Sequence, residues 1–377
     1  MVNFRLKEIV LSIASGITIN HSSKGTYPVY GSTGIIGYTN SNDYSGERIL
    51  IARVGANAGA TNIVCGEYGV SDNTLVITVH SEYEIKYIYY CLKHKKLNQF
   101  VFGSGQPLIT GSLLKNISLY IPDRISQQHI AEALSDVDGM ISSLEKLVAK
   151  YKSIKTACLQ QMFPQNGETV PRMRLPGFTG AWEQRKLGEM GQTYTGLSGK
   201  TKDDFGHGQA RFVTYMNVFS NPISNPEMTE PIEIDPKQNE VDVGDVFFTT
   251  SSETPEEVGM SSVLLEKRGK TYLNSFCFGF RPSEKIDSYY LAYMLRSESA
   301  RAKITLLAQG ISRYNISKNK VMEIAVSLPS LDEQKVIGQY FCQLDNLITI
   351  HQRKLEKVQK IKQGMMQQLL TGKIRLV

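Results

Sequence analysis

The sequence predicts an α+β protein in which a long antiparallel two-helix coiled coil separates two globular mixed α/β domains related by a pseudo-twofold internal repeat. Three observations predict this class. The chain of 377 residues exceeds the usual size of one hydrophobic core, a segment of 47 residues occurs twice, and both copies carry a heptad pattern. With 41% hydrophobic and 21% charged residues, the composition is that of an ordinary globular chain.

The repeat aligns residues 117–163 with residues 324–370 without a gap, at a constant offset of 207, and 11 of the 47 positions are identical. Ordinary composition would give about three identities by chance. The phrase IKTACLQQMF therefore returns as IKQGMMQQLL at the end of the second copy. Weaker echoes extend the repeat towards the N-terminus, because residues 87–93 resemble 290–296 and residues 5–9 resemble 186–190.

Short β-rich runs between Gly, Asn and Ser turns predict the domains that precede each repeated tail. The strands are expected at residues 48–54, 73–79, 245–250, 262–266 and 275–280. An amphipathic helix should follow each set, near residues 84–98 and 287–305, and a further strand should end at Pro122 and at Pro329. The Pro- and Gly-rich residues 164–182 are typical of a linker and docking leader.

Apolar residues at alternating spacings of four and three predict a coiled-coil seam in both tails. The seam residues are Ile130, Leu134, Val137, Ile141, Val148, Lys155, Ile337, Phe341, Leu344, Ile348, Leu355 and Lys362. A helix from residue 126 to 163 would be about 57 Å long, which is too long for one small domain to cover. Each helix should therefore bury its stripe against the other; the alternative is two surface helices that pack on their own domains.

Connectivity then requires the two helices to be antiparallel and brings the C-terminus back towards the N-terminus. Lys155 and Lys362 occupy equivalent positions on the otherwise apolar seam. A polar residue there costs stability but can fix register. Replacing both lysines by leucine is therefore expected to raise thermal stability and to blur the spacing of the domains.

The domain boundaries follow from the repeat. We expect a first domain at residues 1–123, a first long helix at 124–164, a second domain at 165–330 with its leader at 165–182, and a second long helix with the C-terminal tail at 331–377.

Charge and cysteine usage restrict the class of protein. The net charge of +6 is compatible with nucleic acid but does not require it. The five cysteines, Cys65, Cys91, Cys158, Cys277 and Cys342, are scattered and form no CxxC pair, so neither a disulfide framework nor a cysteine zinc site is indicated. The N-terminal residues lack the apolar run of a signal peptide and no run is long enough to span a membrane, so a cytoplasmic location is expected.

The charge is unevenly distributed in the second domain. Residues 227–257 hold ten acids and one lysine, whereas residues 296–320 hold six cations and one acid. This pattern is consistent with one acidic and one basic side, or simply with solvated faces.

The sequence contains no recognisable catalytic or metal-binding motif. The six histidines form no HExxH or HxH cluster. Residues 196–201 contain Gly-Lys-Thr, but Tyr194 stands where a phosphate loop needs glycine. The tetrapeptide of DNA amino-methyltransferases is also missing. We therefore expect a non-catalytic chain without a metal site.

Two matching loops carry recognition chemistry. Residues 103–115 and 309–320 each lead from a Gly-containing polar loop into a short helix, where Thr110 or Ser317 can cap the helix and leave its N–H groups open to phosphate. The amide, aromatic and cationic side chains here suit base edges and DNA backbone. The candidate DNA-binding residues, including cations outside these loops, are Arg53, Lys93, Lys95, Lys96, Gln106, Thr110, Lys115, Arg211, Arg313, Tyr314, Asn315, Lys318 and Lys320. Simple connecting loops remain the alternative.

Four motifs resemble the DNA specificity subunit of type I restriction-modification systems. They are YPVYGSTGIIGY at 27–38, ILIARVG at 49–55, RLPGFTGAWEQRKLG at 174–188 and LPSLDEQ at 328–334. The similarity covers essentially the whole chain, including its duplication. The first tail departs from the pattern, because PDRISQ replaces PSLDEQ, and the first domain lacks the PGFTGAW leader.

The resemblance implies two target-recognition domains, each reading one half of a bipartite DNA site, with helices that set the spacer and dock partner subunits. The implied partners are double-stranded DNA, two methyltransferase (modification) subunits and restriction endonuclease/translocase subunits. No cofactor is implied for this chain, whereas the partner subunits would use S-adenosylmethionine, ATP and magnesium. The alternative is a non-catalytic coiled-coil adaptor that binds protein partners only.

Overall fold

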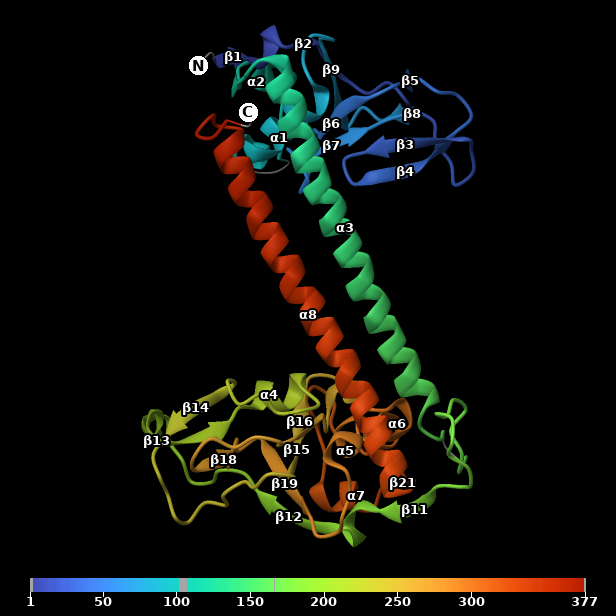
Figure 1. The fold of residues 1–377 in the computed structure, drawn as a ribbon, viewed down its shortest axis with the longest axis vertical. Helices are drawn as coiled ribbons and strands as arrows, with labels where there is room; N and C mark the ends of the chain where they lie inside the picture. The colour runs from blue at the N-terminus through green and yellow to red at the C-terminus, as the bar shows by residue number, and fades with distance from the viewer. Residues whose placement is uncertain (1–2, 102–106, 166, 376–377) are drawn as a thin grey trace. The chain divides into compact units, whose positions relative to one another are not determined.

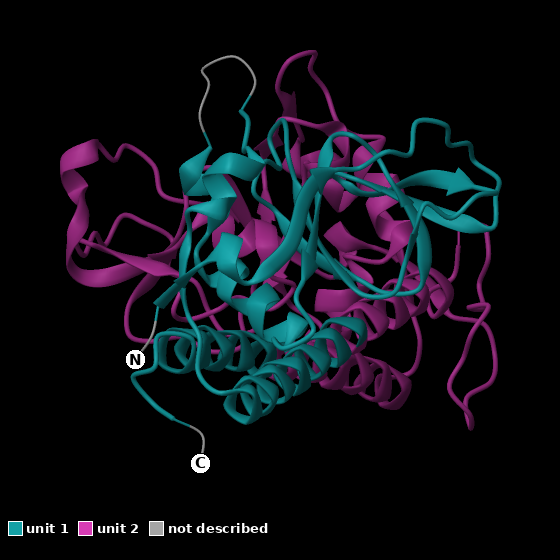
Figure 2. Ribbon diagram, turned by 90° about the horizontal axis from the view of Figure 1, so that it is seen from above, with its two compact units in different colours: residues 1–146, 352–377 teal, residues 147–351 magenta. Residues whose placement is uncertain are grey.

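The computed structural model describes residues 3–101, 107–165 and 167–375 and divides into two compact units. Unit 1 comprises residues 1–146 and 352–377, and unit 2 comprises residues 147–351; Figure 2 shows the two in different colours. Unit 1 is therefore built from two separate stretches of chain. None of the helices in the described ranges is long and apolar enough to cross a membrane.

Unit 1 holds most of the elements from the N-terminus to the first long helix (Figure 1). In chain order they are β1 (Asn3–Arg5), η1 (Leu6–Glu8), β2 (Val10–Ser15), β3 (Tyr27–Gly31), β4 (Gly34–Thr39), β5 (Tyr44–Ser45), β6 (Arg48–Ala52), β7 (Thr61–Val64), β8 (Glu67–Val70), β9 (Thr74–Val79), α1 (Ile85–His94), η2 (Leu97–Phe100), α2 (Gly111–Lys115), β10 (Ser118–Tyr120) and α3 (Arg124–Gln161).

Unit 2 begins within α3 and ends within the second long helix. Its elements are β11 (Glu183–Lys186), η3 (Leu187–Glu189), β12 (Gly191–Thr195), η4 (Lys202–Asp204), β13 (Phe205–Val213), α4 (Tyr215–Ser220), β14 (Thr229–Ile232), β15 (Val246–Thr249), β16 (Ser251–Ser252), η5 (Pro255–Glu257), β17 (Ser261–Val263), β18 (Thr271–Leu273), β19 (Cys277–Pro282), α5 (Ser288–Met294), α6 (Glu298–Thr305), β20 (Tyr314–Asn315), α7 (Lys318–Met322), β21 (Ala325–Leu328) and α8 (Leu331–Leu369).

The internal repeat is confirmed by the sheets. Unit 1 has a four-stranded sheet in the order β2-β9-β6-β7, and unit 2 has the matching order β12-β19-β15-β17. Each unit also pairs its first strand with the strand before its long helix, β1 with β10 and β11 with β21. The duplication therefore extends from the tails to the whole domain.

A second sheet in each unit is also related, with four strands in unit 1 and three in unit 2. Strand β3 pairs in parallel with β8 in unit 1, and β13 pairs in parallel with β18 in unit 2. Their surroundings differ, because the unit 1 sheet has the order β4-β3-β8-β5 and the unit 2 sheet has the order β14-β13-β18. The two copies therefore differ in the strands that flank this parallel pair.

The expected helix at residues 287–305 is wrong in one respect, because it is two helices. α5 ends at Met294 and α6 begins at Glu298. Ser297 lies between them, where its side chain accepts a hydrogen bond from the N–H of Ala300 and its own N–H donates to the carbonyl of Met294. The hydroxyl thus starts a new helix where the sequence pattern indicated one continuous helix.

The two long helices pack against each other in the antiparallel sense within each unit. In unit 1, Ile130 and Leu134 of α3 share a hydrophobic core with Leu369 of α8. In unit 2, Phe163, just beyond α3, stacks on Phe341 of α8 with ring centroids 5.7 Å apart. The seam residues Ile130, Leu134, Val148, Ile337, Phe341, Leu344 and Ile348 are buried, and Val137, Ile141 and Leu355 are half-buried.

Both lysines on this seam form ion pairs with an aspartate of the other long helix. The Lys155 ammonium lies 2.6 Å from a carboxylate oxygen of Asp345, and Lys362 contacts Asp138 in the same way. Leucine at these positions would leave an aspartate without its cation. The expectation that two leucines would raise stability therefore no longer holds.

A buried glutamine fastens the start of each long helix to its domain. The Gln127 side chain donates to the carbonyl of Pro122 at 2.9 Å and accepts the N–H of Glu84 at 2.9 Å. Gln334 makes the same two bonds, to Pro329 at 2.9 Å and to Asp287 at 3.0 Å. Glu84 and Asp287 immediately precede α1 and α5, so each glutamine ties a helix start to the long helix.

The leader of unit 2 adds a contact specific to this copy. Arg174 forms two bonds to the carboxylate of Glu333, at 2.7 and 2.8 Å, and Glu333 is only 2% exposed. Trp182 packs edge-on against Phe163, 6.4 Å between ring centroids. In the first tail Ser126 occupies the position of Glu333, and Asp123 accepts the N–H of Ser126 at 2.9 Å as the helix cap.

Replacing Gln334 by leucine should destabilise unit 2 by about 2 to 5 kcal/mol, because a backbone carbonyl and a backbone N–H would each lose a buried partner. Gln127→Leu should have the same effect on unit 1. Urea unfolding measures both. The exposed neighbour Gln128→Leu is the matched control and should change stability by less than about 0.5 kcal/mol. Equal effects of Q127L and Q128L would contradict the assignment.

Candidate nucleic-acid interface

Each unit has a polar edge where a loop pairs with the segment after the central strand. We call it the paired-loop edge, residues 53–55 with 107–109 in unit 1 and residues 250–252 with 314–316 in unit 2. The N–H of Ile109 donates to the carbonyl of Arg53 at 2.9 Å, and the N–H of Ile316 donates to that of Thr250 at 2.9 Å. The loops that the sequence singled out are therefore held by equivalent bonds in both copies.

In unit 2 the loop is closed by main-chain pairing. Gln309 and Asn315 exchange N–H···O bonds of 2.9 and 2.8 Å. Gly310 within this loop has a φ of 142°, and a Cβ atom there would lie 2.0 Å from the carbonyl oxygen of Arg313. Only glycine permits this close approach. The loop thus presents Ile311, Ser312 and Arg313 in a defined conformation.

Arg313 lies over the centre of the unit 2 edge. Its guanidinium donates to the hydroxyl of Ser251 at 3.3 Å and lies 5.9 Å from the ring centroid of Phe276, which is 55% exposed. The hydroxyl of Tyr215 donates to the carbonyl of Ser251 at 2.6 Å. An open groove of about 440 Å³ lies here, lined by Tyr215, Met216, Phe219, Ser251, Ser252, Glu253, Glu257, Ser312 and Arg313.

Different side chains occupy the unit 1 edge. Arg53 donates to the hydroxyl of Ser15 at the end of β2, at 3.1 Å. Gly55 donates its N–H to the carbonyl of Pro107 at 3.0 Å. Gln106, with the preceding Gly-Ser-Gly, lies outside the described residues.

The helices that follow the loops are single turns of five residues. Thr110 caps α2 as expected, since its hydroxyl accepts the N–H of Leu113 at 3.3 Å. The expectation for Ser317 is wrong, because its side chain makes no capping bond to α7. A helix of a single turn has only a small dipole to attract an anion. In α2 the N–H of Leu113 is also already bonded to Thr110. The N-termini of α2 and α7 are therefore poor phosphate sites.

Of the remaining candidates, Tyr314 and Asn315 belong to the paired-loop edge, and the others lie away from the loop contacts. Lys93 donates to the hydroxyl of Tyr89 at 2.9 Å, and Lys95 and Lys96 line a separate hollow of about 400 Å³ beside Ser118 and Thr371. Arg211 braces β13 against β14 through the side chain and carbonyl of Thr229. Lys115 lies on α2, Lys318 and Lys320 lie on α7, and Tyr314 and Asn315 form β20.

The cation-rich segment does not form one basic face. Arg296 donates to four backbone carbonyls, those of Ser261, Val218, Phe219 and Asn221. Arg301 donates to three further carbonyls and Lys303 to that of Ala325. Burial lowers the pKa of both arginines to about 10, so they remain charged while serving structure. The exposed cations of this segment lie at residues 313 and 320.

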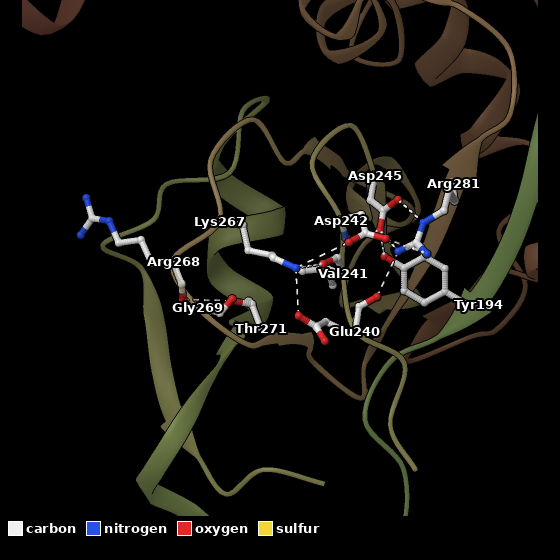
Figure 3. A network of polar contacts seen from close by, with 10 residues as sticks. All are labelled: Tyr194, Glu240, Val241, Asp242, Asp245, Lys267, Arg268, Gly269, Thr271 and Arg281. Atoms are coloured by element: carbon white, nitrogen blue, oxygen red, sulfur yellow. Dashed lines mark hydrogen bonds and ion pairs between the residues drawn. The ribbon is translucent and has the colours of Figure 1, made fainter. Parts of the chain in front are cut away.

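The acid-rich segment is largely neutralised by partners. Figure 3 shows the main network, in which Asp245, 1% exposed, accepts two bonds from Arg281 at 2.8 and 2.7 Å and one from the hydroxyl of Tyr194. Lys267 bridges Glu240 at 2.9 Å and Asp242 at 3.5 Å. The hydrogen bonds that Arg281 donates to the Asp245 carboxylate raise the pKa of the Arg281 guanidinium. The acids next to the start of β15 are therefore paired within unit 2, whereas Glu253 and Glu257 line the groove beside Arg313.

This network and the paired-loop edge lie at opposite ends of β15. Asp245 directly precedes the strand, and Thr250 directly follows it. The charges at the end before β15 are paired with one another. The end after β15 instead exposes Arg313, Phe276 and Ile311, of which Ile311 is 95% exposed. The end that follows β15 is therefore the better candidate for an external ligand.

Sequence reasoning missed several residues of this edge, notably Ser15 in unit 1 and Tyr215, Ser251 and Phe276 in unit 2. Ser251 follows the predicted strand 245–250 directly, which is a usable signal. No such signal marks Tyr215, at the start of α4, or Phe276, just before β19, because only the tertiary fold brings them next to Ser251 and Arg313. Within the described ranges no three His, Cys, Asp or Glu side chains gather as a potential metal site.

A duplicated mixed α/β domain with a polar loop edge in each copy, joined by long helices, defines a class of two-domain binding proteins. The chain belongs to the family of the type I restriction modification DNA specificity domain, whose model matches residues 1–155 and 180–360.

Individual relatives agree with this family. The type I restriction enzyme MjaVIII specificity subunit of Methanocaldococcus jannaschii is 26% identical over 363 residues, covering 87% of this chain and 79% of that protein. The S subunit of the type I restriction-modification system from M. genitalium has the same fold, with a TM-score of 0.62 and 14% identity over 98% of this chain and 96% of that one. A chain solved in work on complex assembly and conformational transition of the type I R-M system gives a TM-score of 0.56 at 15% identity, covering 98% and 97%.

Replacing Asp245 by alanine should cost about 2 to 4 kcal/mol of stability, because the Tyr194 hydroxyl and the Asp242 N–H would lose their buried acceptor, while Arg281, 43% exposed, keeps Asp242. Asp242→Ala is the matched control, since Asp242 is 58% exposed and its ion pairs are worth at most about 1 kcal/mol. Thermal and urea unfolding compare the two variants. A D245A variant as stable as D242A would show that the network is not structural.

Proposed function

We propose that this chain is the sequence-specific DNA-recognition subunit of a type I restriction-modification complex, with each domain reading one half of a bipartite target. The long helices set the spacer between the half-sites and dock the methyltransferase and restriction subunits. The chain itself is proposed to be non-catalytic, with S-adenosylmethionine, ATP and magnesium used by the partner subunits.

The observation that carries the proposal is the paired-loop edge, which occurs twice with the same backbone and different side chains. Arg53, Val54 and Gly55 in unit 1 correspond to Thr250, Ser251 and Ser252 in unit 2. Base edges in the major groove are distinguished by side-chain donors, acceptors and apolar groups. Two copies of one scaffold with different side chains are suited to reading two different half-sites.

The helix lengths support a spacer role. α3 has 38 residues and α8 has 39, so each is about 57 Å long. Half-sites one helical turn apart have centres about 34 to 36 Å apart. Helices of this length can therefore hold two readers on successive turns of one duplex.

Arg313→Ala should weaken binding to the half-site read by unit 2, because a guanidinium facing a groove is suited to bidentate contact with guanine or to phosphate. We expect a loss of about 1 to 3 kcal/mol, roughly 5- to 150-fold in affinity, with discrimination relaxed in that half-site only. Duplex binding assays with each half-site scrambled in turn measure this effect.

The control for this variant is Arg268→Ala, an exposed arginine paired with Glu227 and Glu266 outside the groove. It should leave affinity within about twofold. A salt titration of the unsubstituted protein tests the proposal itself, since log affinity should fall linearly with log salt. An absence of duplex binding at low salt would instead favour the protein-only adaptor.

Deleting the facing heptads 142–148 of α3 and 352–358 of α8 should shorten the recognised spacer by about 3 base pairs, since seven residues span about 10.5 Å. The two half-site sequences should remain the same. Genome-wide mapping of methylated adenines, with the variant replacing the resident gene, measures both. An unchanged spacer in a folded variant would refute the ruler role of the helices.

A further inference from the structure

A cluster of three polar side chains interrupts the apolar seam in unit 2. The Lys155 ammonium of α3 contacts both carboxylate oxygens of Asp345 of α8, at 2.6 and 2.8 Å. The hydroxyl of Tyr293 in α5 donates to the same carboxylate at 2.8 Å, and the Lys155 ammonium lies 5.3 Å from the Tyr293 ring centroid. One aspartate thus joins both long helices and the domain.

Unit 1 contains the same cluster with the helices exchanged. Lys362 of α8 contacts Asp138 of α3, and the hydroxyl of Tyr90 in α1 donates to Asp138 at 2.9 Å. The Lys362 ammonium lies 5.4 Å from the Tyr90 ring centroid. We call these the two seam triads; their lysine side chains are 20% and 11% exposed.

The two seam triads specify one and the same register. In α3, Asp138 precedes Lys155 by 17 residues, and in α8, Asp345 precedes Lys362 by 17 residues. In both ion pairs the two residue numbers add to 500, so the same antiparallel alignment satisfies both. Both aspartates and both lysines are among the identical positions of the repeat.

In each triad, one aspartate carboxylate accepts hydrogen bonds from a lysine ammonium and a tyrosine hydroxyl. Burial raises the pKa of Tyr90 and Tyr293, and the adjacent aspartates raise it further, so both hydroxyls keep their protons at neutral pH. Each carboxylate therefore receives a cation from one helix and a hydroxyl from the domain. Such a geometry is lost when either helix moves along its axis.

Other registers of α3 against α8 are disfavoured because they would place each aspartate opposite an apolar residue. A shift of one heptad in either direction would place Asp345 opposite Met162 or Val148. The same shift would place Asp138 opposite Leu369 or Leu355. A carboxylate without its cation among apolar side chains is strongly disfavoured. The apolar side chains of the seam have no such preference, because they recur at every heptad. Outside the triads, the stacking of His351 on Tyr151 in unit 2, with ring centroids 5.5 Å apart, is one more contact that a heptad shift would break.

Accordingly, we propose that the two seam triads are specificity-determining elements, which select the single register of α3 against α8 and so restrict recognition to one spacer length. This inference rests on the proposed function of the chain. Because α3 and α8 are each continuous, one intact triad is sufficient to hold the register in both units. The residues involved lie in the seam and are not part of a paired-loop edge, so their expected effect is on spacing and not on the half-site sequence.

The test compares two variants of the full chain. The apolar variant carries K155L, D345L, Y293F, K362L, D138L and Y90F, so that every polar group of both triads is removed together and no triad member is left without its partner. The single-triad control carries only K155L, D345L and Y293F and keeps the triad of unit 1. Circular dichroism checks that both are folded; D138N with D345N, which keeps side-chain shape, replaces the apolar variant if that variant is unfolded.

Register is measured without DNA by electron paramagnetic resonance distances between spin labels at residues 142 and 357. Both positions are exposed and lie in unit 1, and Cys65 and Cys342 are replaced by serine to prevent extra labelling. The unsubstituted seam and the single-triad control should give one narrow distance. The apolar or asparagine variant should add populations shifted along the helix by about 10 Å. A single narrow distance there would overturn the inference.

Spacer choice is measured on duplexes carrying the two half-sites of the unsubstituted protein at spacings changed by one to four base pairs. A preference of about tenfold or more for one spacing should fall below about threefold in the apolar variant and persist in the control. Unchanged preference despite a shifted register would refute the link to specificity. If the unsubstituted protein recognises no bipartite site, the proposed function fails, while the distance measurement still decides the register.

Discussion

The packing of α3 against α8 is the constraint on which the rest of the molecule depends. Each helix is too long to be covered by one domain, and each buries its apolar stripe partly on the other helix and partly on the domain beside it. Gln127 and Gln334 then fasten the helix starts to α1 and α5. Domain and helix therefore form one core in each unit, so the orientation of a paired-loop edge is tied to the helix pair.

The arginines of unit 2 fall into two groups, those whose guanidinium is bonded within the protein and those that are exposed. Arg296 and Arg301 donate to backbone carbonyls and Arg281 donates to Asp245. Arg313 makes one 3.3 Å hydrogen bond, to Ser251, and lies over the ring of Phe276. A side chain whose bonding capacity is incompletely used at the rim of an open groove is the type that can exchange protein contacts for ligand contacts. Net charge alone does not reveal this difference.

The parts of the fold that sequence patterns predicted are those with strong periodicity. The repeat, the two long helices and the strands β6, β9, β15 and β19 follow from heptads and β-rich runs. Strands such as β3, β4 and β13 escaped prediction because Gly, His and Gln weaken their pattern and because they acquire partners far away in sequence. In the candidate site, the loops that contain residues 109 and 316 could be predicted from the sequence because the same pattern occurs in both copies. Arg211 and Arg296 were misleading, since charge in a sequence does not indicate which way a guanidinium points.

Unit 1 is completed by the C-terminal part of α8, although all of its strands lie before residue 124. The ribosome therefore makes all of unit 2 before it makes the helix segment that seals the core of unit 1. Until that segment arrives, Ile130, Leu134 and their neighbours lack the cover of Leu369 and Leu370. During synthesis the second domain can fold first, while the part of the first core that Leu369 and Leu370 cover stays accessible to chaperones and proteases.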